Sequence, residues 1–304
     1  MTNLSPSLDP RHKPEPTPQV AQSDMKENQK RKYMSNQPIR ILWQSSTAIQ
    51  HFPAYEKAIQ AHAGKVLSPG SSLVVRGVKE GTNALHYRAF DFLNNSQVFD
   101  SVVNAEHEGC DAVAIGCFID PILDELREIV DIPVMSMGET GMHLACMLGK
   151  RFSVLAYTEA LNDKFYTESA HKYGLQERAS PFVAFELPLE DLEAALAGDP
   201  AKCLQRVHEA GRKAVAMGAE VILLGCGVLN LIAVQNKLTN IDGATVLDVS
   251  GALMKMTEAM VVLRRVSGVS ISRRGFYAKP KPELVEEVLK IYHRGAYANK
   301  GVGQ

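Results

Sequence analysis

The stretch GCDAVAIGC, residues 109–117, recurs along the chain as GAEVILLGC, residues 218–226. The two stretches start 109 residues apart, and each is a short apolar run that ends in Gly-Cys. Runs of this length that are apolar throughout are typical of strands buried on both faces of a parallel sheet. The match therefore indicates an internal duplication of one structural unit.

Further apolar runs extend the repeat on both sides of these stretches. The first set covers residues 39–44, 73–78, 112–118 and 133–137, and the second covers residues 152–157, 181–187, 220–226 and 245–249. Segments of helical length separate the runs, and parallel neighbouring strands need crossovers that are almost always helical. We therefore predict an α/β fold of two pseudo-symmetric domains. Each would be a four-stranded parallel sheet flanked by helices, with the active site in the interdomain cleft.

The ends of the chain differ from its centre in composition. Residues 1–37 hold five of the fifteen prolines and few aliphatic side chains. Such a segment cannot bury enough apolar surface to offset its ordering entropy, so we predict a disordered N-terminal tail. The first domain is expected to comprise residues 38–137 together with 249–294, and the second residues 138–248. Residues 295–304 would form a C-terminal tail.

The overall composition excludes several classes of protein. The 33 Lys and Arg residues balance 34 Asp and Glu residues, so the net charge of −1 gives no reason to expect nucleic acid or an anionic membrane as a partner. No apolar stretch is long enough to span a bilayer. Five cysteines without a C-x-x-C spacing indicate neither a zinc ribbon nor a disulfide framework, so we expect a cytoplasmic location.

The two cysteines that end the repeated stretches are the candidate reactive groups. Ligands of open parallel sheets bind beyond the carboxyl ends of the strands, where Cys117 and Cys226 should lie. Each follows a glycine, and each is expected to precede a helix whose first amides favour a thiolate. For the first, Asp120-Pro121 has the pattern of a helix N-cap followed by proline. Three further cysteines are expected in helical segments, with packing roles: Cys110, Cys146 and Cys203.

Two thiols that face each other across a cleft can carry out chemistry at a stereocentre. One thiolate removes a proton from one face of a carbon next to a carbonyl, and the other thiol delivers a proton to the opposite face. The carbanion is delocalised into the carbonyl, whose developing negative charge could be received by amides at the helix starts. Such a 1,1-proton transfer requires no metal and no organic cofactor, and the sequence signals neither.

Four motifs resemble the hydantoin racemase branch of the aspartate/glutamate racemase superfamily. They are AIGCFIDP (114–121), PVMSMGETGMH (133–143), LLGCGVLNLI (223–232) and SRRGFYAKP (272–280). The likeness covers residues 38–294. It implies a cofactor-independent racemase or epimerase that uses Cys117 and Cys226 as acid and base. A 5-substituted hydantoin or an allantoin-like cyclic amide would be the substrate.

The resemblance also implies a set of substrate-binding residues. These are the polar residues after the first strand of each half and a Gly-Glu pair, namely Ser45, Ser46, Thr47, Thr158, Gly138 and Glu139. Phe118 and Gly227, which directly follow the two cysteines, complete the expected set. We expect a small-molecule substrate and a homo-oligomer, with neither nucleic acid nor membrane as a partner.

Three departures from the family pattern lie near the expected substrate. Residues 43–47 are WQSST in place of an Asn-Pro-Asn-Thr-like turn, and residues 227–230 are GVLN in place of Ala-Gly-Met. Phe118-Ile119 replaces the Asn-Thr that amino-acid racemases carry after the first cysteine, which argues against free aspartate or glutamate as the substrate.

Two alternatives stay open at this stage. The first is a decarboxylase or cis-trans isomerase of the same superfamily that acts on a small dicarboxylate through one cysteine. Arylmalonate decarboxylase-like members retain only the second cysteine, so the presence of both favours racemisation. The second is a non-catalytic, two-lobed protein that binds a small molecule.

Overall fold

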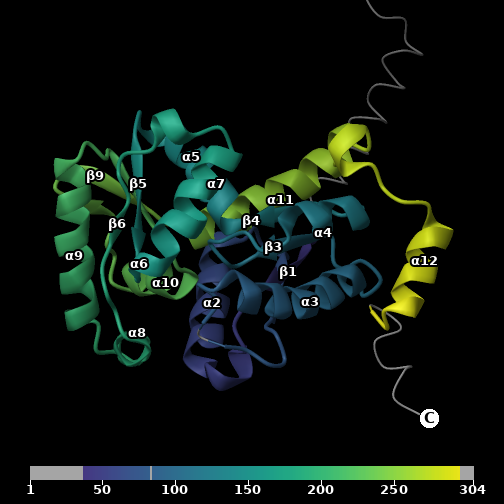
Figure 1. The fold of residues 1–304 in the computed structure, drawn as a ribbon, viewed down its shortest axis with the longest axis horizontal. Helices are drawn as coiled ribbons and strands as arrows, with labels where there is room; N and C mark the ends of the chain where they lie inside the picture. The colour runs from purple at the N-terminus through teal and green to yellow at the C-terminus, as the bar shows by residue number, and fades with distance from the viewer. Residues whose placement is uncertain (1–36, 83, 295–304) are drawn as a thin grey trace, which may run out of the picture.

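A computed structural model describes residues 37–82 and 84–294 of the chain and shows two α/β parts side by side (Figure 1). The first part is built on the sheet order β2-β1-β3-β4, and all its neighbouring strands are parallel. The strands are β1 (Arg40–Gln44), β2 (Ser72–Arg76), β3 (Ala112–Ile115) and β4 (Val134–Ser136). This sheet therefore has the four parallel strands that the sequence predicts.

The second sheet has one strand more than predicted. Its order is β6-β5-β7-β9-β8, and β8 runs antiparallel to β9. The strands are β5 (Phe152–Ala156), β6 (Val183–Ala184), β7 (Val221–Leu224), β8 (Asn240–Ile241) and β9 (Ala244–Leu247). Asp242 and Gly243, which link β8 to β9, both have positive φ, at 48° and 93°. This two-residue Asp-Gly turn is a strong hairpin signal and explains the additional edge strand.

The two sheets share one strand order, since β6-β5-β7-β9 repeats β2-β1-β3-β4 in sequence position. The glycines before the two cysteines extend the ladders in the same way. The amide of Gly116 donates to the carbonyl of Gln44 at 2.8 Å, and the amide of Gly225 donates to that of Leu155 at 3.0 Å. Because these bonds lie at the carboxyl ends of β3 and β7, Cys117 and Cys226 leave their sheets at equivalent positions.

Helices cover both faces of each sheet, as the continuously apolar strands require. Alternate residues of β1 enter different cores, with Trp43 in a central core and Leu42 in an outer one. The central core takes side chains from α2 (Pro53–Val66), α5 (Met137–Leu148) and α11 (Val249–Ser267). The outer cores lie under α3 (Arg88–Ala105) and α4 (Leu123–Ile129), and under α8 (Leu189–Leu196), α9 (Ala201–Ala216) and α10 (Gly227–Gln235).

Two helices cross from one sheet to the other. Helix α5 follows β4 of the first sheet and contacts β5, β7 and β9 of the second. Helix α11 follows β9 of the second sheet and contacts β3, β4 and α2 of the first.

The shorter elements are η1 (Ile49–His51), α6 (Glu159–Leu161), the π-helical turn η2 (Asn162–Thr167), α7 (Glu168–Lys172), η3 (Gln176–Arg178), η4 (Gly275–Tyr277) and α12 (Pro282–Ile291).

Two further predictions can be compared with the structure. Cys146 and Cys203 lie in α5 and α9 as expected, whereas Cys110 lies in the turn before β3, where it is buried. The predicted tails, residues 1–37 and 295–304, lie outside the described residues except for Gln37. Within the described part of the chain, no helix is both long enough and apolar enough to cross a membrane.

The glycine before Cys117 is required by the packing of the only tryptophan. Trp43 is fully buried in β1, and a Cβ at Gly116 would come within 2.3 Å of its indole ring. A larger residue at position 116 would therefore have to displace either the Trp43 ring or the backbone of β3.

We predict that Gly116→Ala lowers the free energy of unfolding by about 1–3 kcal/mol, the usual cost of overpacking a core. Urea denaturation followed by Trp43 fluorescence measures the effect. Gly64→Ala is the matched control, because Gly64 lies in α2 with no atom within 4 Å of its Cβ position. Alanine there should stabilise the protein by up to about 1 kcal/mol through helix propensity. Equal stability of the two variants would contradict the prediction.

Candidate active site

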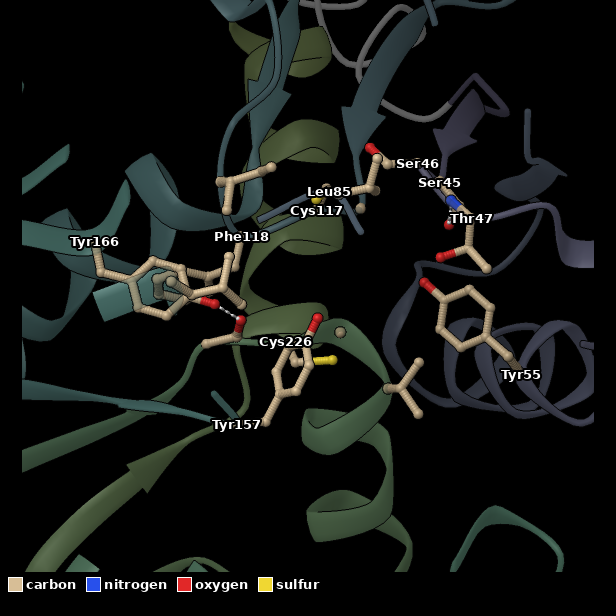
Figure 2. A pocket seen from close by; sticks show the side chains of 16 residues that line it. Ser45, Ser46, Thr47, Tyr55, Leu85, Cys117, Phe118, Tyr157, Tyr166 and Cys226 are labelled. Atoms are coloured by element: carbon tan, nitrogen blue, oxygen red, sulfur yellow. Dashed lines mark hydrogen bonds between the residues drawn. The ribbon is translucent and has the colours of Figure 1, made fainter. Parts of the chain in front are cut away.

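A pocket lies beyond the carboxyl ends of strands from both sheets (Figure 2). The empty space within it, including space open to solvent, is about 560 Å³. Its walls include the residues that follow β1, β3, β5 and β7. A Cβ at Gly227 would lie 3.3 Å from the carbonyl oxygen of Gly116, so the two cysteine-bearing segments approach each other closely.

Both candidate cysteines line this pocket, but their local structures differ. Cys226 is the N-cap residue of α10, as predicted. Cys117 does not precede a helix directly, because α4 begins only at Leu123 and its N-cap is Ile122. Each cysteine is thus followed by a helix, as predicted, but the Asp120-Pro121 pattern predicts the start of the first helix two residues too early.

The thiols are held in their neutral form by burial. Burial raises the pKa of Cys117 to about 12, against the Ile119 backbone amide and the nearby Ser46 hydroxyl, which lower it. Burial also raises the pKa of Cys226, against the amides of Leu229 and Val228 at the start of α10. The predicted thiolate preference at helix starts is thus present at Cys226 but is outweighed by desolvation in the unliganded protein.

The turn after β1 supplies the polar side of the pocket. Ser45, Ser46 and Thr47 all line it, as expected for substrate contacts. The Ser45 hydroxyl accepts a hydrogen bond from the Thr47 amide at 3.1 Å, which holds the turn. Ser46 Oγ is buried and has no hydrogen-bond partner of normal geometry among the described residues. It is therefore a polar atom that a bound molecule could satisfy.

Phe118 and Gly227 also line the pocket, whereas three other expected residues do not. The Glu139 carboxylate pairs with Arg127, at 2.9 Å from Nη1 to Oε1. The Thr158 hydroxyl donates to Glu186 at 3.3 Å. Gly138 lies under the Phe118 turn, where a Cβ would come within 2.4 Å of the Phe118 carbonyl oxygen. The structure thus gives these residues packing and ion-pair contacts outside the pocket.

Several pocket residues were missed by the sequence analysis. They are mainly aromatic and aliphatic, namely Tyr55, Leu85, Ile119, Tyr157, Leu161, Tyr166 and Val228. Tyr157 directly follows β5, so the expectation that ligands bind beyond the carboxyl ends of strands also applies to it. The sequence analysis selected its neighbour Thr158 instead. Tyr55 lies in α2 and Tyr166 in η2, where no strand-end signal exists. None of the pocket residues in the described chain is Asp, Glu, Lys or Arg.

Tyr166 joins the two cysteine-bearing segments. Its ring meets that of Phe118 edge to face, with centroids 5.3 Å apart, and its hydroxyl donates to the Gly225 carbonyl. A Cβ at Gly225 would lie 2.6 Å from this ring, so glycine is again required before the cysteine. Tyr166 lies in a π-helical turn, a rare conformation that is frequent at functional sites.

Asp120 has a different role from the predicted cap of the helix that follows it. Its carboxylate accepts hydrogen bonds from the amides of Gly138 and Glu139, both at 2.7 Å, at the start of α5. It also accepts from the Ser136 hydroxyl and, at 2.6 Å, from the Tyr173 hydroxyl. Two free amides of a helix start, together with its dipole, are a strong site for an anion. The pKa of Asp120 is raised by burial to about 6, against these hydrogen bonds.

Comparison with known proteins identifies what this chain resembles. A family model described as Asp/Glu/Hydantoin racemase matches residues 53–257. A hydantoin racemase from Pseudomonas sp. (strain NS671) is 27% identical over 248 residues, which are 81% of this chain and 95% of that protein. The structure of an allantoin racemase from Klebsiella pneumoniae is similar, with a TM-score of 0.68 and 25% identity over 80% of this chain and 94% of that one. The structure of an allantoin racemase from Pseudomonas fluorescens is also similar, with a TM-score of 0.67 and 25% identity over 80% of this chain and 98% of that one.

We predict that Asp120→Asn lowers the free energy of unfolding by about 2–4 kcal/mol, because an amide has one acceptor oxygen and leaves buried donors unpaired. Tyr173→Phe removes a single donor from the same carboxylate and should cost about 1–2 kcal/mol. Urea denaturation of both variants gives the two losses in free energy of unfolding, and the loss should be larger for Asp120→Asn. A loss below about 0.5 kcal/mol for Asp120→Asn would exclude the carboxylate as an anchor of α5.

The raised pKa of Cys117 predicts slow alkylation of the unliganded protein. Below its pKa a thiol gains thiolate about tenfold per pH unit, so the rate with iodoacetamide should still be rising between pH 8 and pH 10. Peptide mass spectrometry separates Cys117 from the other cysteines and gives its rate at each pH. A plateau below about pH 8 would show that the thiol is already ionised near neutrality.

Proposed function

This chain belongs to the Asp/Glu/hydantoin racemase family and is an isomerase, and we propose that it racemises a neutral cyclic amide by two-cysteine proton transfer. The substrate class is a 5-substituted hydantoin or an allantoin-like ring. The observation that carries the proposal is one pocket lined by Cys117 and Cys226 and by no charged side chain among the described residues. The relatives named hydantoin racemase and allantoin racemase agree with this substrate class.

The proposed reaction starts from one thiolate and one thiol. The thiolate Sγ takes the proton from the carbon between ring nitrogen and carbonyl, and the C–H electron pair moves into the carbonyl to form an enolate. The other thiol then gives its proton to the opposite face, and the C–H bond re-forms with inverted configuration. The thiol and thiolate have then exchanged roles. One enantiomer is therefore the substrate when Cys117 is the thiolate, and the other enantiomer when Cys226 is the thiolate.

The lack of charge in the pocket supports a neutral ring over a dicarboxylate. A buried carboxylate needs a cation or several donors to offset its desolvation, and the lining offers hydroxyls and backbone amides but no Lys or Arg in the described chain. The apolar lining residues Leu85, Leu161 and Val228 suit an aliphatic or aromatic substituent. We therefore place 5-alkyl and 5-aryl-methyl hydantoins ahead of allantoin, whose substituent is polar.

We also propose the two-domain arrangement and its cleft. The domain boundaries are 38–137 with 249–294, and 138–248. The shared strand order and the crossing of α5 and α11 between the sheets support this division. Assembly into a homo-oligomer is supported by apolar side chains exposed on α12, including Leu284 and Ile291. Cytoplasmic location stays a prediction.

The substrate class is tested by polarimetry on enantiopure 5-benzylhydantoin, allantoin, aspartate, glutamate and a substituted malonate. We expect rotation to decay to zero fastest with 5-benzylhydantoin. Loss of CO₂ from the malonate with unchanged hydantoin rotation would favour the decarboxylase alternative. No reaction with any compound, but protection of both thiols by one of them, would favour a binding protein.

We predict that Cys117→Ser and Cys226→Ser each reduce racemisation by about 10²–10⁴-fold, the usual contribution of one general acid or base. Each variant should still exchange solvent deuterium into one enantiomer only, and the two variants should prefer opposite enantiomers. Polarimetry and NMR in D₂O measure both effects. Cys146→Ser is the control, because Cys146 is half-buried in α5 outside the pocket. Full activity in both pocket variants would exclude the two-cysteine mechanism.

A further inference from the structure

One pocket residue has a hydrogen-bonding arrangement that the two-cysteine reaction does not use. Tyr55 lies in the first turn of α2 with 1% of its surface exposed, and its ring stacks on Phe52 with centroids 6.0 Å apart. The indole Nε1 of Trp43 donates a hydrogen bond to the Tyr55 hydroxyl oxygen at 3.2 Å. Because Gly116 confines the Trp43 ring, this donor has a fixed direction.

The direction of this hydrogen bond determines what the tyrosine hydroxyl can do. An indole N–H can only donate, so the Tyr55 oxygen is the acceptor and its own O–H remains to be donated elsewhere. A hydroxyl that accepts one hydrogen bond becomes a better donor for a second. The Ser45 side chain also lies within hydrogen-bonding reach of this hydroxyl in the unliganded protein. The O–H of Tyr55 is therefore a polarised donor on the pocket wall that would exchange Ser45 for a bound carbonyl oxygen.

The surroundings of this hydroxyl place it beside the reacting groups. A Cβ at Gly227 would lie 3.4 Å from Tyr55 Oη, so the hydroxyl adjoins the residue that follows Cys226. Figure 2 shows the Tyr55 ring opposite Cys226, with its hydroxyl toward the Ser45–Thr47 turn. Burial raises the pKa of Tyr55 well above its ordinary value, against hydrogen bonds from Trp43 and Ser45 that lower it, and both thiols raise it further. The hydroxyl therefore remains protonated and neutral at any working pH.

We propose that the Tyr55 hydroxyl, oriented by Trp43, donates a hydrogen bond to the substrate carbonyl oxygen as it becomes an enolate oxygen. The inference rests on the proposed racemase function. When a cysteine thiolate removes the substrate proton, the C–H electron pair shifts to that oxygen, and the Tyr55 O–H hydrogen bond shortens without transferring its proton. The second cysteine thiol supplies the proton that restores the C–H bond, so Tyr55 is unchanged at the end of the cycle.

This role accounts for features that a packing role leaves unexplained. A phenylalanine would fill the same space in the core, yet the chain places a hydroxyl where its oxygen must be desolvated. The cost of that desolvation is recovered only if the hydroxyl has strong partners. Trp43 satisfies its acceptor side, and a developing oxyanion would satisfy its donor side. Preorganised donors of this kind stabilise the transition state more than the ground state.

The test is Tyr55→Phe in the full-length chain, assayed with enantiopure 5-benzylhydantoin. Loss of one oxyanion donor should reduce kcat by about 10²–10³-fold. KM should change by less than about threefold, because the neutral carbonyl of the ground state gains little from the hydrogen bond. The primary deuterium isotope effect at the substrate C–H bond should be retained or increased, since proton removal becomes more clearly rate-limiting. Emission from Trp43, the only tryptophan, reports whether its environment stays buried.

Tyr277→Phe is the matched control. Its hydroxyl donates to Asp124 at 2.9 Å, and Tyr277 does not line the pocket. This variant loses a tyrosine hydrogen bond of similar length and should keep its kcat within about twofold, as expected for a surface-side substitution remote from the reaction.

The outcomes separate the inference from the function on which it rests. If the wild-type protein racemises the hydantoin and Tyr55→Phe retains kcat within threefold, the Tyr55 role is excluded and the two-cysteine reaction stands. A rise in KM with unchanged kcat also excludes it, since it would show uniform binding. If the wild-type protein neither racemises any tested ring nor exchanges its C–H with D₂O, both the proposed function and the Tyr55 role are excluded.

Discussion

The pocket depends on close packing between an aromatic ring and a glycine at the end of each central strand. Trp43 lies against Gly116, and Tyr166 lies against Gly225, at distances that leave no room for a Cβ. Each glycine also continues the hydrogen bonding of its sheet by one residue. Rigid rings on rigid strand ends therefore set where the next residue, a cysteine, leaves each sheet. Small shifts there would alter the separation of the two thiols, on which the proposed proton transfer in both directions depends.

A buried carboxylate adds a second constraint across the same region. Asp120, three residues after Cys117, binds the start of α5 and the hydroxyl of Tyr173. Helix α5 directly follows the last strand of the first sheet in the chain, but it also packs against strands of the second sheet. The carboxylate thus connects the first cysteine segment to elements that pack on both sheets. The helix-start amides and the two hydroxyls offset part of the cost of burying this carboxylate.

The electrostatic character of the pocket follows from these two constraints. Its described lining is uncharged, and burial holds both thiols in the protonated form in the unliganded protein. Ionising one thiol in such surroundings requires donors. Those beside Cys226 are the amides of Val228 and Leu229, and those beside Cys117 are the Ile119 amide and the Ser46 hydroxyl. A neutral ring with its own N–H groups and carbonyls complements this lining, whereas a dicarboxylate would add charge to it. The same hydroxyls and amides would serve thiolate and enolate in turn.

Local sequence determined the positions of the eight parallel strands, the repeat and both cysteines, but not the antiparallel edge strand β8. Burial on two faces of a sheet demands uninterrupted apolar runs that end at ligand-binding edges. Local sequence also pointed to the turn at Ser45–Thr47. It did not determine the hydrogen-bond partners of Asp120. The Asp-Pro pattern predicted that Asp120 caps α4, whereas in the structure its carboxylate binds the first amides of α5. Nor did it reveal Tyr55 or Tyr166, which reach the pocket from α2 and η2. Contacts between residues distant in the chain depend on how helices are laid over the sheets, and on which buried donors compete for one acceptor. Neither leaves a periodic or short-range signal in the sequence, so only the tertiary structure decided them.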